Sequence, residues 1–131
     1  MPIVTVHLVE GRHPADQIST LLVALTERYA SVLGEPVDRV RAFAQLHPPG
    51  MWVTGGEQDV EAPYFTALVL TGRPLAQRRR LLADFTDLIV DVLWVERASV
   101  RGRIVPVDPD DWGIGGVTTG ECRRREPDER G

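Results

Sequence analysis

The sequence predicts a two-layer α/β sandwich, in which a four-stranded sheet is covered by two helices. Three observations predict it: an internal duplication, a strand-like segment at the start of each copy, and a helix-length connection to the next strand. Connections of that length suit parallel β-α-β pairing. Two such units form two packed layers, and 131 residues are enough for one domain of this kind.

The duplication is marked by four landmarks that recur 60 or 61 positions apart. The paired landmarks are Pro2 and Pro63, Gly11-Arg12 and Gly72-Arg73, Arg39-Val-Arg41 and Ser99-Val-Arg101, and Trp52-Val-Thr-Gly-Gly56 and Trp112-Gly-Ile-Gly-Gly116. Repeats of this length indicate copies of one supersecondary unit. We therefore expect a single domain over residues 1–117, made of repeats at about 2–60 and 63–117.

The first copy reads as strand, helix and strand. Residues 3–9 are rich in Val, Leu, Ile and Thr, as strands are. A helix is expected from near Pro14 to Gly34, because apolar residues recur every three or four positions and glycine favours the helix end. The stripe consists of Ile18, Leu21, Leu22, Leu25, Tyr29, Val32 and Leu33. The second strand is predicted at about 39–46.

The second copy repeats this order. A strand is predicted at 64–71, a helix from near Pro74, and a strand at about 99–107. The helix stripe consists of Leu81, Leu82, Phe85, Leu88, Ile89, Val92 and Leu93. Residues 53–62 read as a polar link between the copies. Residues 118–131 carry no apolar anchor, so a flexible tail is expected there.

Composition excludes several kinds of chemistry. The fifteen basic residues are all arginine, and no lysine is present, which excludes a lysine Schiff base and a P-loop lysine. One cysteine, Cys122, excludes an intrachain disulfide and a cysteine metal cluster. The net charge of −4 gives no support to nucleic-acid binding. We expect a cytoplasmic protein with neither a metal nor a cofactor, and no membrane partner.

Pro2 is the residue with the greatest chemical potential. A small second residue such as proline normally permits removal of Met1, which would leave a secondary amine at the chain terminus. An α-amino group titrates near pH ~7.7–8.0, and burial beside arginines lowers its pKa. A base near neutrality suits proton abstraction beside a carbonyl. The alternative is that proline is simply a common residue after an initiator methionine.

Arginines occupy equivalent positions in both copies. Arg12 and Arg73 follow the first strands, and Arg41 and Arg101 lie in the second strands. Arginine binds carboxylates with two parallel hydrogen bonds and stays charged. A small carboxylate with a neighbouring ketone is therefore the predicted ligand, although each arginine could also be an ordinary surface ion-pair partner.

These residues resemble the tautomerase superfamily, of which 4-oxalocrotonate tautomerase is the type member. The resemblance is carried by the N-terminal proline, the Gly-Arg pair ten residues later, Arg39-Val-Arg41 and the Trp-x-x-Gly-Gly turns. It covers about residues 2–117. A fused pair of this length is similar to malonate semialdehyde decarboxylase, and the resemblance implies a homotrimer.

The resemblance implies roles for particular residues. The catalytic proline corresponds to Pro2, whereas Pro63 has its nitrogen in a peptide bond and cannot act as a base. The first substrate arginine corresponds to Arg12 or Arg73, with Arg73 favoured. The second corresponds to Arg41 and Arg101. Trp52 and Trp112 occupy the positions of the family's aromatic wall residue, but packing is as good an interpretation for both.

Three functions are compatible with this pattern. The fused pair is also similar to the 3-chloroacrylic acid dehalogenases, but Pro106 falls near the position of their water-activating glutamate and Tyr29 at that of their helix histidine, which argues against dehalogenation. A tautomerase acting on a 2-oxo or 2-hydroxydienoate acid is favoured, with Pro2 as general base. A decarboxylase would use protonated Pro2 and Asp38, which corresponds to that family's catalytic aspartate, although Leu75 replaces its second arginine. A catalytically silent trimeric binding protein is the third, and retention of Met1 would favour it.

Overall fold

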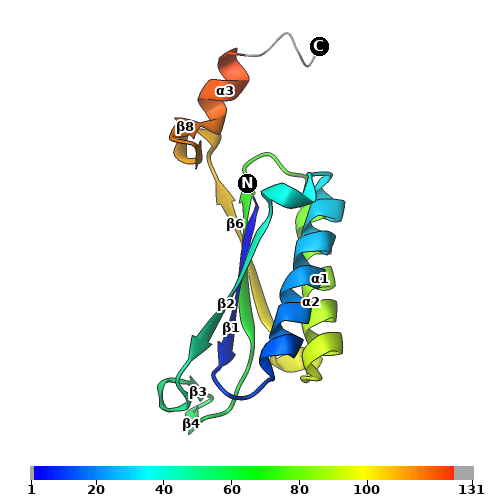
Figure 1. Cartoon of the computed structure of the whole chain (residues 1–131), viewed down its shortest axis with the longest axis vertical. Helices are drawn as coiled ribbons and strands as arrows, with labels where there is room; N and C mark the ends of the chain where they lie inside the picture. Colours follow the sequence, from blue (N-terminus) through cyan, green and yellow to red (C-terminus); the bar gives the residue numbers. More distant parts are fainter. Residues whose placement is uncertain (1, 126–131) are drawn as a thin grey trace.

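The computed structural model describes residues 2–125 and confirms the predicted α/β sandwich. One sheet has the strand order β2-β1-β5-β6, and two helices pack on one of its faces (Figure 1). The first copy supplies β1 (Ile3–Val9), α1 (Ala15–Leu33) and β2 (Arg41–His47). The second supplies β5 (Tyr64–Leu70), α2 (Leu75–Leu93) and β6 (Arg101–Val107).

Strand direction determines which residues share an end of the sheet. β1 is parallel to β2, and β5 is parallel to β6, as helix-length connections predict. The two copies meet through an antiparallel pair in which Ile3 of β1 lies opposite Leu68 of β5. The start of β1 therefore lies beside the end of β5, and the reverse holds at the other end.

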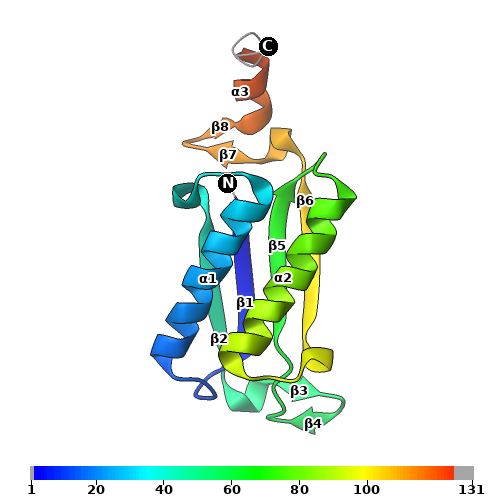
Figure 2. The ribbon, with the colours of Figure 1, turned by 90° about the vertical axis from the view of Figure 1, so that its right-hand side faces the viewer.

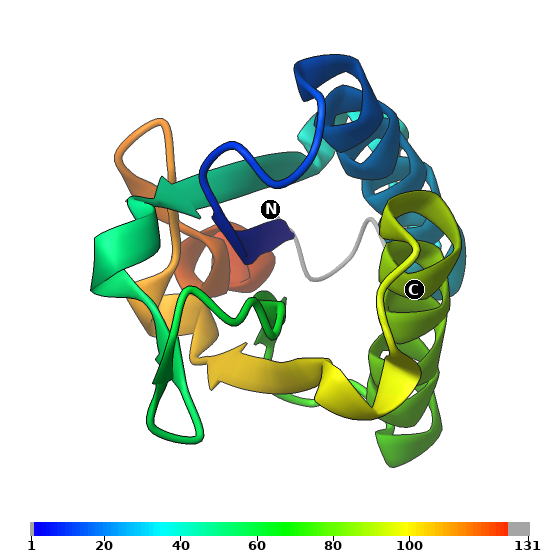
Figure 3. The same cartoon turned by 90° about the horizontal axis from the view of Figure 1, so that it is seen from below.

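The hydrophobic core lies between the sheet and the helices. Alternate strand residues are buried toward α1 and α2, as a period of two requires. The two helices lie side by side over one face of the sheet (Figures 2 and 3), and the residues of both predicted apolar stripes belong to the core or pack against it. Phe85 of α2 is central, because its ring makes edge contacts with Tyr29 and Phe65 at centroid distances of 5.1 and 5.6 Å. Among the residues 2–122 whose burial is described, every buried residue of the core is apolar or aromatic.

The helix ends differ between the copies. α1 ends at Gly34, whose φ of 68° lies in the left-handed region and whose N–H donates to the Ala30 carbonyl. α2 ends in the same geometry at Trp94, with φ of 59° and no glycine. Each helix begins one residue after its proline, so Pro14 and Pro74 occupy the N-cap positions.

Short 3₁₀ turns precede the second strands and shift their starts. Val37–Arg39 (η1) and Arg97–Ser99 (η3) are helical turns, so β2 and β6 begin two residues later than predicted. Two further turns, Pro49–Met51 (η2) and Pro109–Asp111 (η4), follow these strands.

The Gly-Gly pairs form hairpin turns, which corrects the prediction of a simple polar link at 53–62. β3 (Val53–Thr54) pairs with β4 (Glu57–Gln58), and β7 (Gly113–Ile114) pairs with β8 (Val117–Thr118). Gly55 and Gly56 both have positive φ, of 59° and 83°. Two successive residues with positive φ are what a type I′ hairpin turn requires, and glycine adopts them without strain.

The prediction of a flexible tail from residue 118 is corrected over 118–125. Thr118 belongs to β8, and Thr119–Arg125 form α3. Backbone and capping bonds hold this helix: Thr119 N–H donates to the Trp112 carbonyl at 2.8 Å, and Glu121 N–H donates to Thr118 Oγ1 at 3.1 Å. Residues 126–131, also part of that prediction, lie outside the described residues.

Gly102 in β6 is required for packing against Phe65. A Cβ at this position would lie 2.1 Å from the end of the buried Phe65 ring. We expect Gly102→Ala to lower the free energy of unfolding by about 1–3 kcal/mol through overpacking. Thermal unfolding would measure this loss. Gly50→Ala is the matched control, because its Cβ would meet no atom within 4 Å, and an equal loss in both variants would contradict the packing argument.

Within residues 2–125, no helix combines the length and the apolar character needed to cross a bilayer.

Candidate active site

A small cavity lies where the start of β1 meets the end of β5. Pro2 and Arg73 line it together with Trp112 and Glu35, and apolar residues complete its wall: Leu33, Leu68, Val69 and Leu70. The antiparallel register explains this convergence, because it brings the turn after β5 to the residue that precedes β1. Residues 71 positions apart in the chain thereby share one cavity.

A second, larger cavity of about 600 Å³ adjoins the first and shares Glu35, Leu70 and Trp112 with it. Asp38, Arg39 and Arg41 also line it. A volume of this size accommodates a small-molecule ligand. The β7–β8 hairpin and α3 stand at this end of the sheet in Figure 1 and contribute Gly113, Ile114 and Cys122 to the cavity wall.

The proline itself is held firmly at the edge of the core. Its side chain is less than 2% exposed, and its carbonyl accepts a hydrogen bond from Arg41 N–H at 3.0 Å. Pro63 repeats this arrangement with Arg101 N–H, also at 3.0 Å. The two copies therefore hold their prolines in the same hydrogen-bonded arrangement.

Arg73 is oriented by the C-terminal end of α1. Its Nη1 donates to the Leu33 carbonyl at 2.9 Å, and its Nη2 forms an ion pair with Glu35 Oε1 at 2.8 Å. Unpaired carbonyls at a helix end carry partial negative charge, which favours a cation there. The guanidinium is thus fixed at the cavity wall.

Tyr29 supports this wall from the core. Its hydroxyl donates to the carbonyl of Leu68, a residue that lines the cavity. Burial raises the pKa of the Tyr29 phenol well above its ordinary value, although the nearby Arg73 acts in the opposite direction. Tyr29 is therefore a neutral hydrogen-bond donor and not a base.

Known proteins resemble this chain in sequence and in fold. A family model described as tautomerase enzyme matches residues 2–59, which span the first copy. The probable tautomerase K2 of Dickeya dadantii (strain 3937) is 39% identical over 49 residues, which make up 37% of this chain and 73% of that protein.

The chain belongs to the tautomerase family. The resemblance inferred from the sequence is thus confirmed, and solved structures extend it to both copies. An asymmetric trimer of the wild-type F6 fused 4-OT superposes with a TM-score of 0.86 and 28% identity, over 92% of this chain and 98% of that one. A native fused 4-OT gives 0.85 and 26%, over 91% and 97%.

A structure of N1, a member of the cis-3-chloroacrylic acid dehalogenase family, has a TM-score of 0.81. At 18% identity over 88% of this chain and 82% of that one, it shows a shared fold alone.

The tautomerase fold divides the residues predicted for the site between two ends of the sheet. Pro2, Asp38, Arg41, Arg73 and Trp112 line the two adjoining cavities. Three others lie at the opposite end, beside Pro63: Arg12, Trp52 and Arg101. The cause is strand direction, because equivalent residues of two antiparallel copies must lie at opposite ends.

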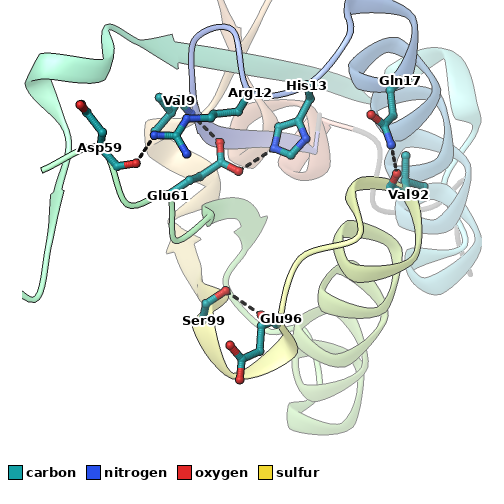
Figure 4. A network of polar contacts seen from close by, with 9 residues as sticks. All are labelled: Val9, Arg12, His13, Gln17, Asp59, Glu61, Val92, Glu96 and Ser99. Carbon is teal, nitrogen blue, oxygen red and sulfur yellow. Dashed lines mark hydrogen bonds and ion pairs between the residues drawn. The ribbon is translucent and has the colours of Figure 1, made fainter. Parts of the chain in front are cut away.

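The opposite end of the tautomerase has its own polar network (Figure 4). Arg12 donates to the Asp59 carbonyl, and Glu61 accepts from Val9 N–H at 2.7 Å while pairing with His13 at 2.6 Å. Arg101 Nη1 donates to the Ala98 carbonyl at 2.7 Å. Trp52 Nε1 donates to Thr54 Oγ1 at 2.9 Å. The contacts of Arg12 and Glu61 tie the segment that follows β4 to the end of β1 and the turn after it.

Sequence reasoning missed Glu35. Glu35 stands between Gly34 and Pro36, and this local pattern indicates a turn at the end of a helix. It does not indicate that the Glu35 carboxylate contacts Arg73, 38 positions away. That contact depends on the antiparallel packing of the copies.

His7 and His47 form a stacked pair on the sheet face away from the helices. His7 Nδ1 lies 2.8 Å from His47 Nε2. The Tyr64 ring also stacks with the His7 ring, at a centroid distance of 5.5 Å. Burial lowers the pKa of His7 below its ordinary 6.5, and His47 lowers it further.

The His7 shift predicts a pH effect on stability. Below pH 6.5 the unfolded chain protonates this histidine before the folded one does, so the unfolded state binds more protons and stability falls as the pH is lowered. We expect the melting temperature to drop between pH 7 and pH 5, and the drop to be smaller in His7→Gln. An unchanged slope in the variant would contradict the assignment.

Proposed function

We propose that this tautomerase uses the Pro2 amine, freed by removal of Met1, for keto–enol conversion of a small 2-oxo or 2-hydroxydienoate carboxylic acid. The observation that carries the proposal is the convergence of Pro2, Arg73 and Trp112 on one cavity. A base, a fixed cation and an aromatic wall are what a planar conjugated acid needs for binding and proton transfer.

The proposed reaction moves one proton and changes no oxidation state. The neutral Pro2 nitrogen accepts the proton of the enol hydroxyl, and the resulting ammonium returns a proton to a carbon of the conjugated system. Arg73 binds the substrate carboxylate, and Arg41 stabilises the enolate from the adjoining cavity. Trp112 packs against the conjugated plane.

A homotrimer is part of this proposal. The F6 fused 4-OT relative at 28% identity is a trimer. The sheet face away from the helices also supports assembly, because Phe43 on that face is 51% exposed in a single chain. In such a trimer a neighbouring subunit would bring its Arg12 or Arg101 to a site. Light scattering after gel filtration would measure whether the chain has the molar mass of a trimer.

Decarboxylation of malonate semialdehyde is the second candidate, and the position of Asp38 favours it. This aspartate lines the cavity that adjoins Pro2, together with Arg41. In that reaction protonated Pro2 would polarise the β-carbonyl while the carboxylate leaves as carbon dioxide. Release of carbon dioxide without ketonisation of any enol would establish this reaction in place of the first.

The direct test combines mass and activity. Intact-mass spectrometry determines whether Met1 is removed, and ketonisation of the phenylpyruvate enol is followed by its ultraviolet absorbance. A chain that retains Met1 and ketonises no enol would contradict the proposal and favour a silent binding protein.

A further inference from the structure

Glu35 is a carboxylate built into the wall of the candidate active site. It lines both cavities, and its side chain is 18% exposed. Its backbone N–H donates to the Ala30 carbonyl at 3.0 Å, which anchors it to the end of α1. Pro36 then restricts Glu35 to an extended backbone. The backbone that carries this carboxylate is therefore fixed beside the site.

The carboxylate occupies part of the binding capacity of Arg73. A guanidinium has five N–H donors, and the bonds to Leu33 and Glu35 engage both terminal nitrogens of Arg73. Glu35 Oε2 also lies 3.6 Å from Arg39 Nη1. A substrate carboxylate must share Arg73 with this internal counter-ion, so it binds a cation that is already partly neutralised.

The net charge of the residues that line the two cavities is balanced by a ligand with one negative charge. Among the described residues that line them, the arginines are Arg39, Arg41 and Arg73, and the carboxylates are Glu35 and Asp38. Within one chain, three cations against two anions give these walls a formal charge of +1, in which the Pro2 amine and the arginine proposed from a neighbouring subunit are not counted. A monoacid neutralises this charge, whereas a diacid brings a second charge into a site that holds Glu35.

The second copy has no equivalent carboxylate. The position 60 residues after Glu35 is Val95, although Gly34 and Trp94 end their helices in the same geometry. A carboxylate needed for the fold would be expected in both copies. Glu35 instead lies at the end of the sheet that holds Pro2.

We propose that Glu35 is a specificity-determining residue, whose ion pair with Arg73 makes the tautomerase prefer substrates with one carboxylate over those with two. This inference rests on the proposed tautomerase function. Glu35 limits how much positive charge Arg73 offers, and it repels a second carboxylate at the far end of a conjugated acid.

The test uses two enols that differ in a single group, 2-hydroxyhexa-2,4-dienoate and 2-hydroxyhexa-2,4-dienedioate. We expect wild-type kcat/KM to favour the monoacid by about fivefold or more. Glu35→Gln keeps a side-chain oxygen for Arg73 but removes the charge, so it should shift the ratio about tenfold toward the diacid, mainly through KM. Glu57→Gln is the matched control, because it removes the same charge in β4, at the opposite end of the sheet from Pro2.

Two further measurements separate charge from structure. Glu35→Ala also removes the acceptor for Arg73, and we expect it to lower kcat/KM for both enols. In wild type, raising the salt concentration should weaken the preference, because salt screens charge–charge repulsion. This second measurement holds even if the Glu35 variants fold poorly.

The outcomes distinguish this inference from the function on which it rests. A wild-type preference for the diacid, or an equal ratio in wild type, Glu35→Gln and Glu57→Gln, overturns the role of Glu35 while enol conversion still depends on Pro2. Activity that is independent of Pro2 overturns the proposed function itself.

Discussion

Pro2→Ala is expected to lower kcat/KM for enol conversion by about 10²-fold or more. A positioned general base contributes ~10²–10⁴-fold to rate, and the ring of Pro2 fixes its nitrogen at the cavity where Arg73 lies. Alanine would leave a primary amine at the terminus, but without the buried ring that holds it in place. The measurement is ketonisation kinetics of wild type and variant, with circular dichroism to confirm the fold.

Pro63→Ala is the matched control for this experiment. Pro63 is buried, and its carbonyl accepts the same hydrogen bond as that of Pro2. Its nitrogen lies within a peptide bond, so it has no basic lone pair to lose. We expect this variant to keep its activity per folded molecule. Equal losses in both variants would show that the ring matters for packing and not for proton transfer.

Arg73→Ala is expected to have the second largest effect, a loss of about 10²–10³-fold in kcat/KM. Removing one preorganised donor to a developing negative charge typically costs this much. The change also removes the ion-pair partner of Glu35, whose carboxylate is largely shielded from water. Arg73→Lys should recover part of the loss, because a lysine supplies the charge without the planar pair of donors.

The equivalent change at the other end, Arg12→Ala, identifies which arginine serves the substrate. Arg12 donates to the Asp59 carbonyl near Pro63, far along the sheet from Pro2. We expect a smaller loss than in Arg73→Ala, measured in the same assay. A larger loss in Arg12→Ala would mean that the arginine of the first copy, brought by a neighbouring subunit, binds the substrate instead.

Local patterns along the chain were sufficient to predict most of the fold. The apolar stripes predicted both helices, and the duplication predicted that the second copy would repeat the first. Element ends were less accurate where the local signal was weak, as at Trp94, which ends α2 without a glycine. The tail was misjudged because α3 is held by contacts with Trp112 and Thr118, which composition does not reveal.

The sequence by itself determined the two-copy α/β architecture, and it singled out Pro2 and the repeated arginines as candidate site residues. The tertiary structure decided which of them lie at the same end of the sheet. Because the copies meet through antiparallel β1 and β5, the arginine that reaches Pro2 belongs to the second copy, and Arg12, Trp52 and Arg101 lie at the other end. The same packing brings Glu35 against Arg73, a contact across 38 residues that no local pattern encodes.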